Sequence, residues 1–326
     1  MTVVDFHTHY YPPDYLAALE TGPSNVRVTR DAEGNPWLHY PGDYNVAVRG
    51  HRDLAFREED VPARGVDLQV LTLTTPGTHV ETPAVAVRLA SLVNDAFARA
   101  AHDRPHRFTA LATLPLNDSA ASARELDRAM RQLGLPGAML FSNVNGAALA
   151  DERFWPLYEV ANDLGAVFFI HPTSPLGVEA MKEYWLMPLV GFLCDTTLAA
   201  AHLVFSRVTE RFPRIRWVLG HLGGAIPYLA ERLDRGYEAF PECRTHLHQP
   251  PSLSLRDFFY DTVNFDPAAI QFAIGFAGAD RIVAGSDYPH RIGSIERMRE
   301  SIASLRISED ERQAILGGNA RHLLGL

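Results

Sequence analysis

The feature that most limits the fold of this chain is a regular alternation of short apolar runs with longer stretches of helical pattern. Eight runs rich in β-forming residues span 3–9, 68–74, 108–114, 137–142, 166–171, 215–221, 258–263 and 281–286. Helical patterns lie between them, for example at 83–103, 119–133, 151–164 and 225–239. Near-continuous apolar strands such as AVFFI and IRWVL are typical of a parallel sheet covered on both faces.

Eight strands with helices between them predict an α/β fold of the (β/α)8, or TIM-barrel, type as a single domain over 1–326. An open, doubly wound sheet is the alternative. After strand 1, within about 20–52, the turn signal DAEGNP separates two strand-like runs and predicts a small β-hairpin insertion. The mostly helical stretch 174–213 predicts extra helices after strand 5, packed beside the barrel or against a partner.

Composition and charge restrict the class of protein. The hydrophobic share of 47% and the charged share of 21% are those of an ordinary globular protein. A net charge of −9 disfavours a nucleic-acid partner or an anionic membrane surface. Two cysteines build no disulfide framework. With no signal-like N-terminus and no apolar run of the roughly 18 residues that a membrane span needs, we expect a soluble cytoplasmic protein.

The first predicted strand carries two histidines in the stretch VVDFHTHYYPP, residues 3–13. Side chains alternate between the faces of a strand, so His7 and His9 point the same way. Two imidazoles side by side repel when protonated and gain little by packing, which favours a chelating role. A surface or core histidine pair is the alternative interpretation.

Three further predicted strands deliver a polar side chain at the same relative position. His171 ends AVFFI, His221 ends IRWVLG, and Asp287 follows RIVAGS. In a TIM barrel, chemistry sits at the C-terminal ends of the strands. Histidines with an aspartate and an open position for water suit a catalytic divalent-metal site rather than a closed structural one.

These motifs carry a family resemblance. DFHTH, FFIHP, LGHLGG and AGSDYPH resemble the signature of the amidohydrolase superfamily, in the branch of aminocarboxymuconate semialdehyde decarboxylase and related aromatic-acid decarboxylases. The similarity extends over most of the chain, including EEDVPARGVDLQV and GGNARHLLGL. The resemblance implies that His7, His9, His171 and Asp287 bind the metal and that His221 is the catalytic acid/base. The fourth strand, GAMLFS, lacks the lysine that bridges two metals in many members, so we expect one ion, Zn²⁺ with Mn²⁺ as the alternative.

Two reactions suit these residues. In the first, an acid protonates the carbon that bears the carboxylate of an unsaturated or aromatic acid, and CO2 leaves. In the second, metal-bound hydroxide attacks a lactone, ester or amide, with Asp287 as base and His221 helping to stabilise the oxyanion. We expect the non-oxidative decarboxylase, with the hydrolase as the alternative. A non-catalytic metal-binding protein is a third interpretation, and it predicts a saturated site.

Arg232 is the first candidate for a contact with the substrate carboxylate. By the same resemblance, Arg232 matches an arginine that binds substrate carboxylate from the neighbouring subunit, which implies a homodimer. A solvated helix arginine is the alternative, because the surrounding ERLDR is also typical of a charged helix face.

The second substrate arginine of the resembled enzyme has no counterpart here. Its position in the insertion falls on Asn45, with Arg49 and Arg52 nearby. An amide does not replace a bidentate guanidinium, so the substrate is expected to be a different carboxylic acid. We take Arg49 and His290 as candidate substrate contacts and His79 as a further one, with loop histidines bonded to the backbone as the alternative for the last two.

Overall fold

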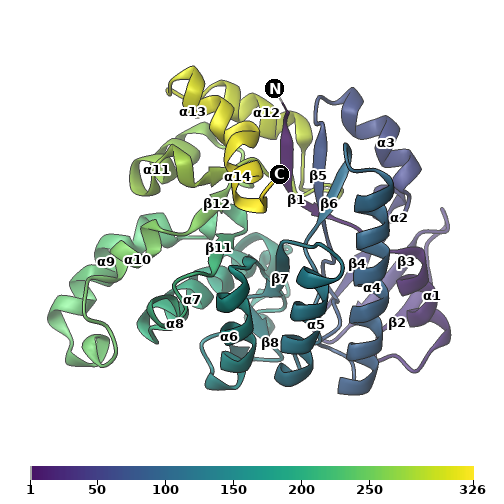
Figure 1. The fold of residues 1–326 in the computed structure, drawn as a ribbon, viewed down its shortest axis with the longest axis horizontal. Helices are drawn as coiled ribbons and strands as arrows, with labels where there is room; N and C mark the ends of the chain where they lie inside the picture. The colour runs from purple at the N-terminus through teal and green to yellow at the C-terminus, as the bar shows by residue number, and fades with distance from the viewer. Residues whose placement is uncertain (1) are drawn as a thin grey trace.

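Eight parallel strands form the centre of the computed structural model, which describes residues 2–326 (Figure 1). They are β1 (Val4–His9), β5 (Leu68–Thr72), β6 (Phe108–Ala110), β7 (Gly137–Phe141), β10 (Val167–His171), β11 (Arg216–Leu219), β12 (Phe259–Asp261) and β13 (Ile282–Val283). Each falls within a strand predicted from the sequence. The ladders group them as β1–β5–β6 and β7–β10–β11–β12–β13.

Two backbone bridges join these groups into a closed ring. Ala112, just beyond β6, pairs in parallel with Ala138 of β7. On the other side, Thr8 of β1 pairs in parallel with Tyr288, beyond β13. A doubly wound sheet keeps two free edges, so the closure identifies the TIM barrel and rules out the open-sheet alternative.

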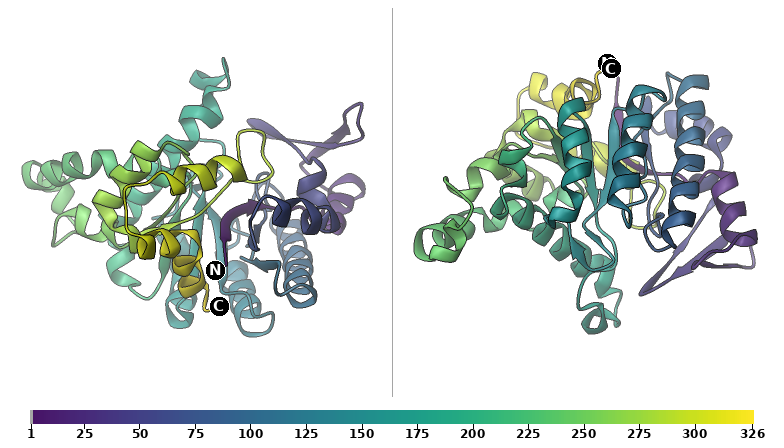
Figure 2. Two further views of the ribbon diagram at one scale, coloured as in Figure 1. Left: turned by 90° about the horizontal axis from the view of Figure 1, so that it is seen from above. Right: turned by 60° about the horizontal axis from the view of Figure 1, so that its bottom comes forward.

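Helices cover the outside of the ring (Figures 1 and 2). The chain forms α1 (Pro13–Thr21), α2 (Arg49–Arg52), α3 (Leu54–Ala63), α4 (Pro83–Asp103), α5 (Ser119–Arg131), α6 (Trp155–Leu164), α7 (Phe192–Phe205), α8 (Val208–Arg211), α9 (Ile226–Ala239), α10 (Pro251–Arg256), α11 (Pro267–Ala277), α12 (Ile295–Ala303), α13 (Glu309–Gln313) and α14 (Asn319–Leu324). In α4, Leu89, Val93 and Phe97 recur every four residues and are all buried, so this helix turns an apolar stripe to the barrel. Phe168 and Phe169 of β10 are both fully buried although they point to opposite faces, as a sheet covered by helices requires.

The insertion after β1 is a separate antiparallel sheet. It consists of β2 (Arg27–Arg30), β3 (Pro36–Tyr40) and β4 (Asp43–Val46). Asp31 makes the first turn by accepting the backbone N–H groups of Glu33 (2.9 Å) and Asn35 (2.8 Å). The predicted hairpin is therefore confirmed, and a third strand extends it.

The predicted extra helices after strand 5 are also present. Short helices at Val178–Met181 (η2) and Met187–Gly191 (η3) lead into α7, and this segment projects from the barrel in the left view of Figure 2. The continuous helix Met187–Phe205 has 19 residues and a mean hydropathy of 1.5, so by length and composition it qualifies as a membrane span. The prediction that no such run exists is wrong. In this structure α7 is anchored to the barrel, because its buried Asp195 accepts hydrogen bonds from Ser142 and Asn143 beyond β7.

Candidate metal centre

Four side chains from three barrel strands converge at the C-terminal ends of the strands, here called the barrel mouth. His7 and His9 lie on β1, His171 ends β10, and Asp287 follows β13. One ligand atom from each lies within 4.8 Å of the others, and all four residues are buried. The structure thus brings together the four residues that the sequence resemblance implied as ligands.

Hydrogen bonds select the nitrogen that His9 and His171 turn to this cluster. The hydroxyl of Thr72 donates to the carbonyl of Thr8 (2.8 Å), so its oxygen accepts from Nδ1–H of His9 (3.0 Å). Nδ1–H of His171 donates to the carbonyl of Pro172 (2.8 Å). In both rings Nδ1 carries the proton, and Nε2 is left with the lone pair that a metal ion requires.

His7 is oriented by a carboxylate that the sequence analysis missed. Its Nδ1 lies 2.5 Å from Oδ2 of Asp261, and its Nε2 lies 3.1 Å from Nε2 of His9 and 3.3 Å from Oδ1 of Asp287. A carboxylate behind a metal-binding histidine is a common arrangement that fixes the ring and raises its basicity. Asp261 ends β12, so its place at a strand end was a signal in the sequence.

Three of the four cluster residues are in the protonation state that binds a cation. Burial lowers the pKa of His9 and of His171 well below 6.5, so both rings are neutral at pH 7. Burial opposes ionisation of Asp287, but the neighbouring histidines outweigh it and hold its pKa well below 3.8. Burial likewise acts to lower the pKa of His7, yet Asp261 outweighs it and raises that pKa. Below that raised pKa, a metal ion must displace a proton from His7.

His221 borders the cluster without joining the set of ligand atoms. Its Nε2 lies 3.9 Å from Oδ2 of Asp287, and its side chain is 13% exposed. The backbone there is left-handed, with φ of 53° at His221 and 56° at Leu222. Asp261 holds this strained turn by accepting both backbone N–H groups, at 3.1 and 2.9 Å. One carboxylate thus positions His7 and His221 together.

Two further histidines, His290 and His51, lie next to the cluster on the side of His9. His290 lies with its ring centroid 4.9 Å from that of His9, so this predicted substrate contact is beside the cluster. His51 of α2 was not singled out from the sequence, yet it is buried and its ring lies 4.8 Å from that of His290. Burial lowers the pKa of His51 well below 6.5. His79, the other candidate, is buried against Phe141 at the end of β7, with 4.5 Å between ring centroids.

Neither predicted arginine has a contact with the four residues of the metal cluster among the interactions of this chain. Arg49 is exposed, with its Nε 2.9 Å from Asp53 and its guanidinium over the ring of Phe56. Arg232 is exposed on α9. Asn45, which replaces the missing arginine, is buried and donates from Nδ2 to the carbonyl of Thr75 (3.3 Å).

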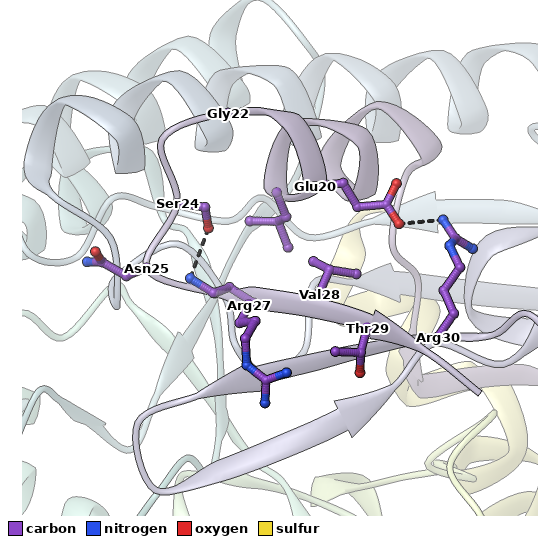
Figure 3. A pocket seen from close by; sticks show the side chains of 10 residues that line it. Glu20, Gly22, Ser24, Asn25, Arg27, Val28, Thr29 and Arg30 are labelled. Carbon is purple, nitrogen blue, oxygen red and sulfur yellow. Dashed lines mark hydrogen bonds and ion pairs between the residues drawn. The ribbon is translucent and has the colours of Figure 1, made fainter.

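A surface groove of about 690 Å³ lies between the end of α1 and β2, lined by Leu19, Glu20, Gly22 and residues 24–30 (Figure 3). Glu20 and Arg30 form an ion pair within it. Its lining residues all precede β3, and they include none of the residues of the metal cluster. The groove is therefore separate from the candidate metal centre.

Comparison with known proteins matches residues 4–326 to the family model described as amidohydrolase. The chain is 34% identical over 274 residues to the 2-amino-3-carboxymuconate-6-semialdehyde decarboxylase of Dictyostelium discoideum, covering 83% of this chain and 76% of that one. It is 29% identical over 279 residues to the γ-resorcylate decarboxylase of a Polaromonas strain, covering 80% and 84% of the two chains.

The fold has a close counterpart among solved structures. The crystal structure of 5-carboxyvanillate decarboxylase from Sphingomonas paucimobilis superimposes with a TM-score of 0.88. That match covers 100% of this chain and 99% of the other, at 26% sequence identity.

Proposed function

The chain belongs to the amidohydrolase family, and from this premise we propose that it is a metal-dependent non-oxidative decarboxylase of an aromatic carboxylic acid. The observation that carries the proposal is the convergence of three Nε2 atoms and a carboxylate at the barrel mouth, with His221 beside them. Hydrolysis of a lactone, ester or amide would use the same metal ligands and the same His221. The relatives described above are all decarboxylases, which favours loss of CO2.

We propose that one divalent ion binds to His7, His9, His171 and Asp287. Three imidazole nitrogens and one carboxylate oxygen fit Zn²⁺, with Mn²⁺ as the alternative. The hydrogen bonds that occupy the three Nδ1 atoms support this assignment, because they leave Nε2 of each ring for the ion. When bound, the ion supplies a positive charge that orients and polarises the oxygen substituents of the substrate.

His221 is the proposed proton donor. It gives its proton to the ring carbon that bears the carboxylate, which interrupts the conjugation of the ring. The C–C bond then breaks, CO2 leaves, and the electron pair of that bond returns to the ring and restores its aromaticity. Asp287, 3.9 Å away, stabilises the protonated imidazole that begins the next cycle.

We further propose that the chain works as a homodimer in the cytoplasm, with Arg232 acting on the active site of the partner subunit. The projecting segment after β10 exposes large apolar side chains, which marks an interaction surface. They are Leu176 (63% exposed), Tyr184 (81%), Trp185 (57%), Leu189 (47%) and Val190 (48%). Cys194 and Cys243 are both free, which suits a reducing compartment.

Metal analysis followed by a CO2-release screen tests the proposal. Purified protein should carry about one Zn²⁺ or Mn²⁺ ion per chain, as a mononuclear site requires. It should release CO2 from one or more hydroxylated benzoic acids, and His221→Ala should abolish turnover while keeping the metal. Cleavage of lactones or amides without CO2 release would assign hydrolysis instead.

A further inference from the structure

Arg57 is a buried cation that takes no part in the reaction described above. It lies on α3, and its side chain is fully buried. Burial lowers the pKa of its guanidinium only to about 10, so the group is charged at pH 7. Within residues 2–326 its hydrogen bonds all go to uncharged oxygen atoms. Burying a charge without an acid in contact is costly, so these neutral contacts need an explanation.

The contacts of this guanidinium lie on segments that carry the metal cluster. Nη2 donates to the backbone carbonyl of His9, the proposed metal ligand that ends β1. Nε donates to the carbonyl of Gly50 on α2 (2.6 Å). Cζ lies 5.0 Å from the ring centroid of Tyr288, the residue that follows Asp287. One planar group therefore fixes the end of β1 against α2 and against the loop after β13.

Gln69 of β5 connects Arg57 to a buried carboxylate. Nη1 of Arg57 donates to Oε1 of Gln69 (3.2 Å), and Nε2 of Gln69 donates to Oδ2 of Asp5 (3.4 Å). Asp5 also accepts the backbone N–H (2.9 Å) and the hydroxyl (2.5 Å) of Ser286, which directly precedes Asp287. The chain of hydrogen bonds therefore runs from the backbone of one proposed metal ligand to the neighbour of another.

The shape of the guanidinium explains why an arginine occupies this position. Its five N–H donors form a rigid planar fork, so it can reach β1, β5 and α2 at the same time. The ammonium of a lysine is a compact point charge on a flexible stem and has no such fork. Close packing keeps α2 within reach, because a Cβ atom on Gly50 would lie 2.8 Å from both Cβ of Pro289 and Oη of Tyr288.

We propose that Arg57, Gln69 and Asp5 form one chain of positioning residues that sets the places of His9 and Asp287 for the metal ion. The inference rests on the proposed metal site. Loss of Arg57 leaves the carbonyl of His9 without this donor, and loss of Gln69 separates Arg57 from Asp5. Because both losses break the same chain, the second should add little to the first.

Binding of Co²⁺ tests this without turnover, because the visible absorption of the bound ion reports the arrangement of its ligands. Arg57→Met and Gln69→Leu should each weaken Co²⁺ binding by about tenfold and change the absorption spectrum. The double variant should also lose about tenfold, whereas independent effects would give about 100-fold. Arg57→Lys keeps the charge but not the fork, so it should behave like Arg57→Met.

Arg216→Met is the matched control. Arg216 is partly buried and also donates to two backbone carbonyls, those of Leu323 (2.6 Å) and Gly165 (2.7 Å). It begins β11, however, and so lies at the end of the barrel opposite the mouth. This variant should lose stability in urea unfolding and keep the Co²⁺ affinity and spectrum of wild type. Circular dichroism establishes that each variant is folded.

A folded Arg57→Met protein with wild-type Co²⁺ affinity and spectrum would overturn the proposal. Full recovery in Arg57→Lys would also overturn it, because charge alone would then be enough. If Arg57→Met does not fold, Gln69→Leu leaves Arg57 in place, and an unchanged spectrum there has the same meaning.

The outcome for wild type keeps this inference separate from the proposed function. Wild-type protein that binds no Co²⁺ would refute the metal site and this inference with it. Co²⁺ binding that depends on Arg57, with no CO2 released from any acid, would refute the decarboxylase and leave the positioning chain standing. Co²⁺ binding and CO2 release that are both indifferent to Arg57 and Gln69 would refute the positioning chain alone.

Discussion

Asp261 supports the site from behind with a single carboxylate. Its Oδ2 holds Nδ1 of His7, and its Oδ1 accepts the backbone N–H of Leu222 in the turn that carries His221. Asp261→Asn keeps an acceptor for one backbone N–H but loses the charge that faces His7. We expect the affinity for Zn²⁺ to fall about 10- to 100-fold, as measured by chelator competition. Asp151→Asn, at an exposed helix start, is the control and should bind metal normally. Equal affinity in both variants would argue against this role.

The same pair makes metal binding depend on pH. Asp261 raises the pKa of His7, and a metal ion must displace the His7 proton, so affinity should decline as pH falls through that raised pKa. In Asp261→Asn the pKa of His7 drops, and the decline should begin at a lower pH. Zn²⁺ titrations from pH 5 to 8 measure, for wild type and for Asp261→Asn, the pH at which the affinity begins to decline. If the decline in Asp261→Asn began at a higher pH than in wild type, or at the same pH, Asp261 would not be the group that raises the pKa of His7.

Among the elements, the insertion sheet carries a partly buried acid, Asp43, that lowers the stability of the fold at neutral pH. Burial raises the pKa of Asp43 from 3.8 to about 6, while hydrogen bonds from Tyr40 and the backbone partly offset it. The folded state therefore binds this proton more tightly than the unfolded state, so stability falls as pH rises from about 4 to 6. Asp43→Asn should gain stability relative to wild type over that range, by at most about 3 kcal/mol. Urea unfolding at pH 4 and pH 7 measures the difference, and a constant difference would count against the shifted pKa.

The projecting segment after β10 supports a prediction about assembly. Leu189 and Val190 are each nearly half exposed on it. A double substitution to Arg and Glu should dissociate the proposed dimer, because charged groups cannot be desolvated in an apolar contact. Val87→Arg, on α4 and 41% exposed, is the matched control and should leave the dimer intact. Light scattering distinguishes the two results. A wild-type monomer at micromolar concentration would refute the dimer itself.

For the whole molecule, the sequence predicted the barrel and the metal cluster because both follow from local patterns. Buried parallel strands are apolar throughout, and the ligands sit where those strands end, so strand prediction alone placed His171 and Asp287 at one mouth. His51 was missed because its position depends on the close approach of Gly50 to Pro289, a contact between segments far apart in the sequence. The third strand of the insertion was missed because DYNV is only four residues long and half of it is Asp and Asn, which are depleted in strands.

The proposed role of Arg232 links assembly to catalysis, and the residue is exposed on α9 of its own chain. If it completes the active site of the partner subunit, Arg232→Ala should raise KM for the acid and lower kcat/KM by about 100-fold, the loss of a charged hydrogen bond to carboxylate. Arg235→Ala, whose guanidinium pairs with Glu238, should have no such effect.

Mixed dimers decide whether Arg232 acts within its own chain or across the interface. A dimer of one Arg232→Ala chain and one His221→Ala chain has one fully intact site only if the arginine comes from the partner. Co-expression of the two differently tagged chains should therefore recover up to about half of the wild-type turnover per dimer, while each parent homodimer stays nearly inactive. If Arg232 instead serves its own subunit, both sites of the mixed dimer are defective, and the purified heterodimer would be as inactive as its parents.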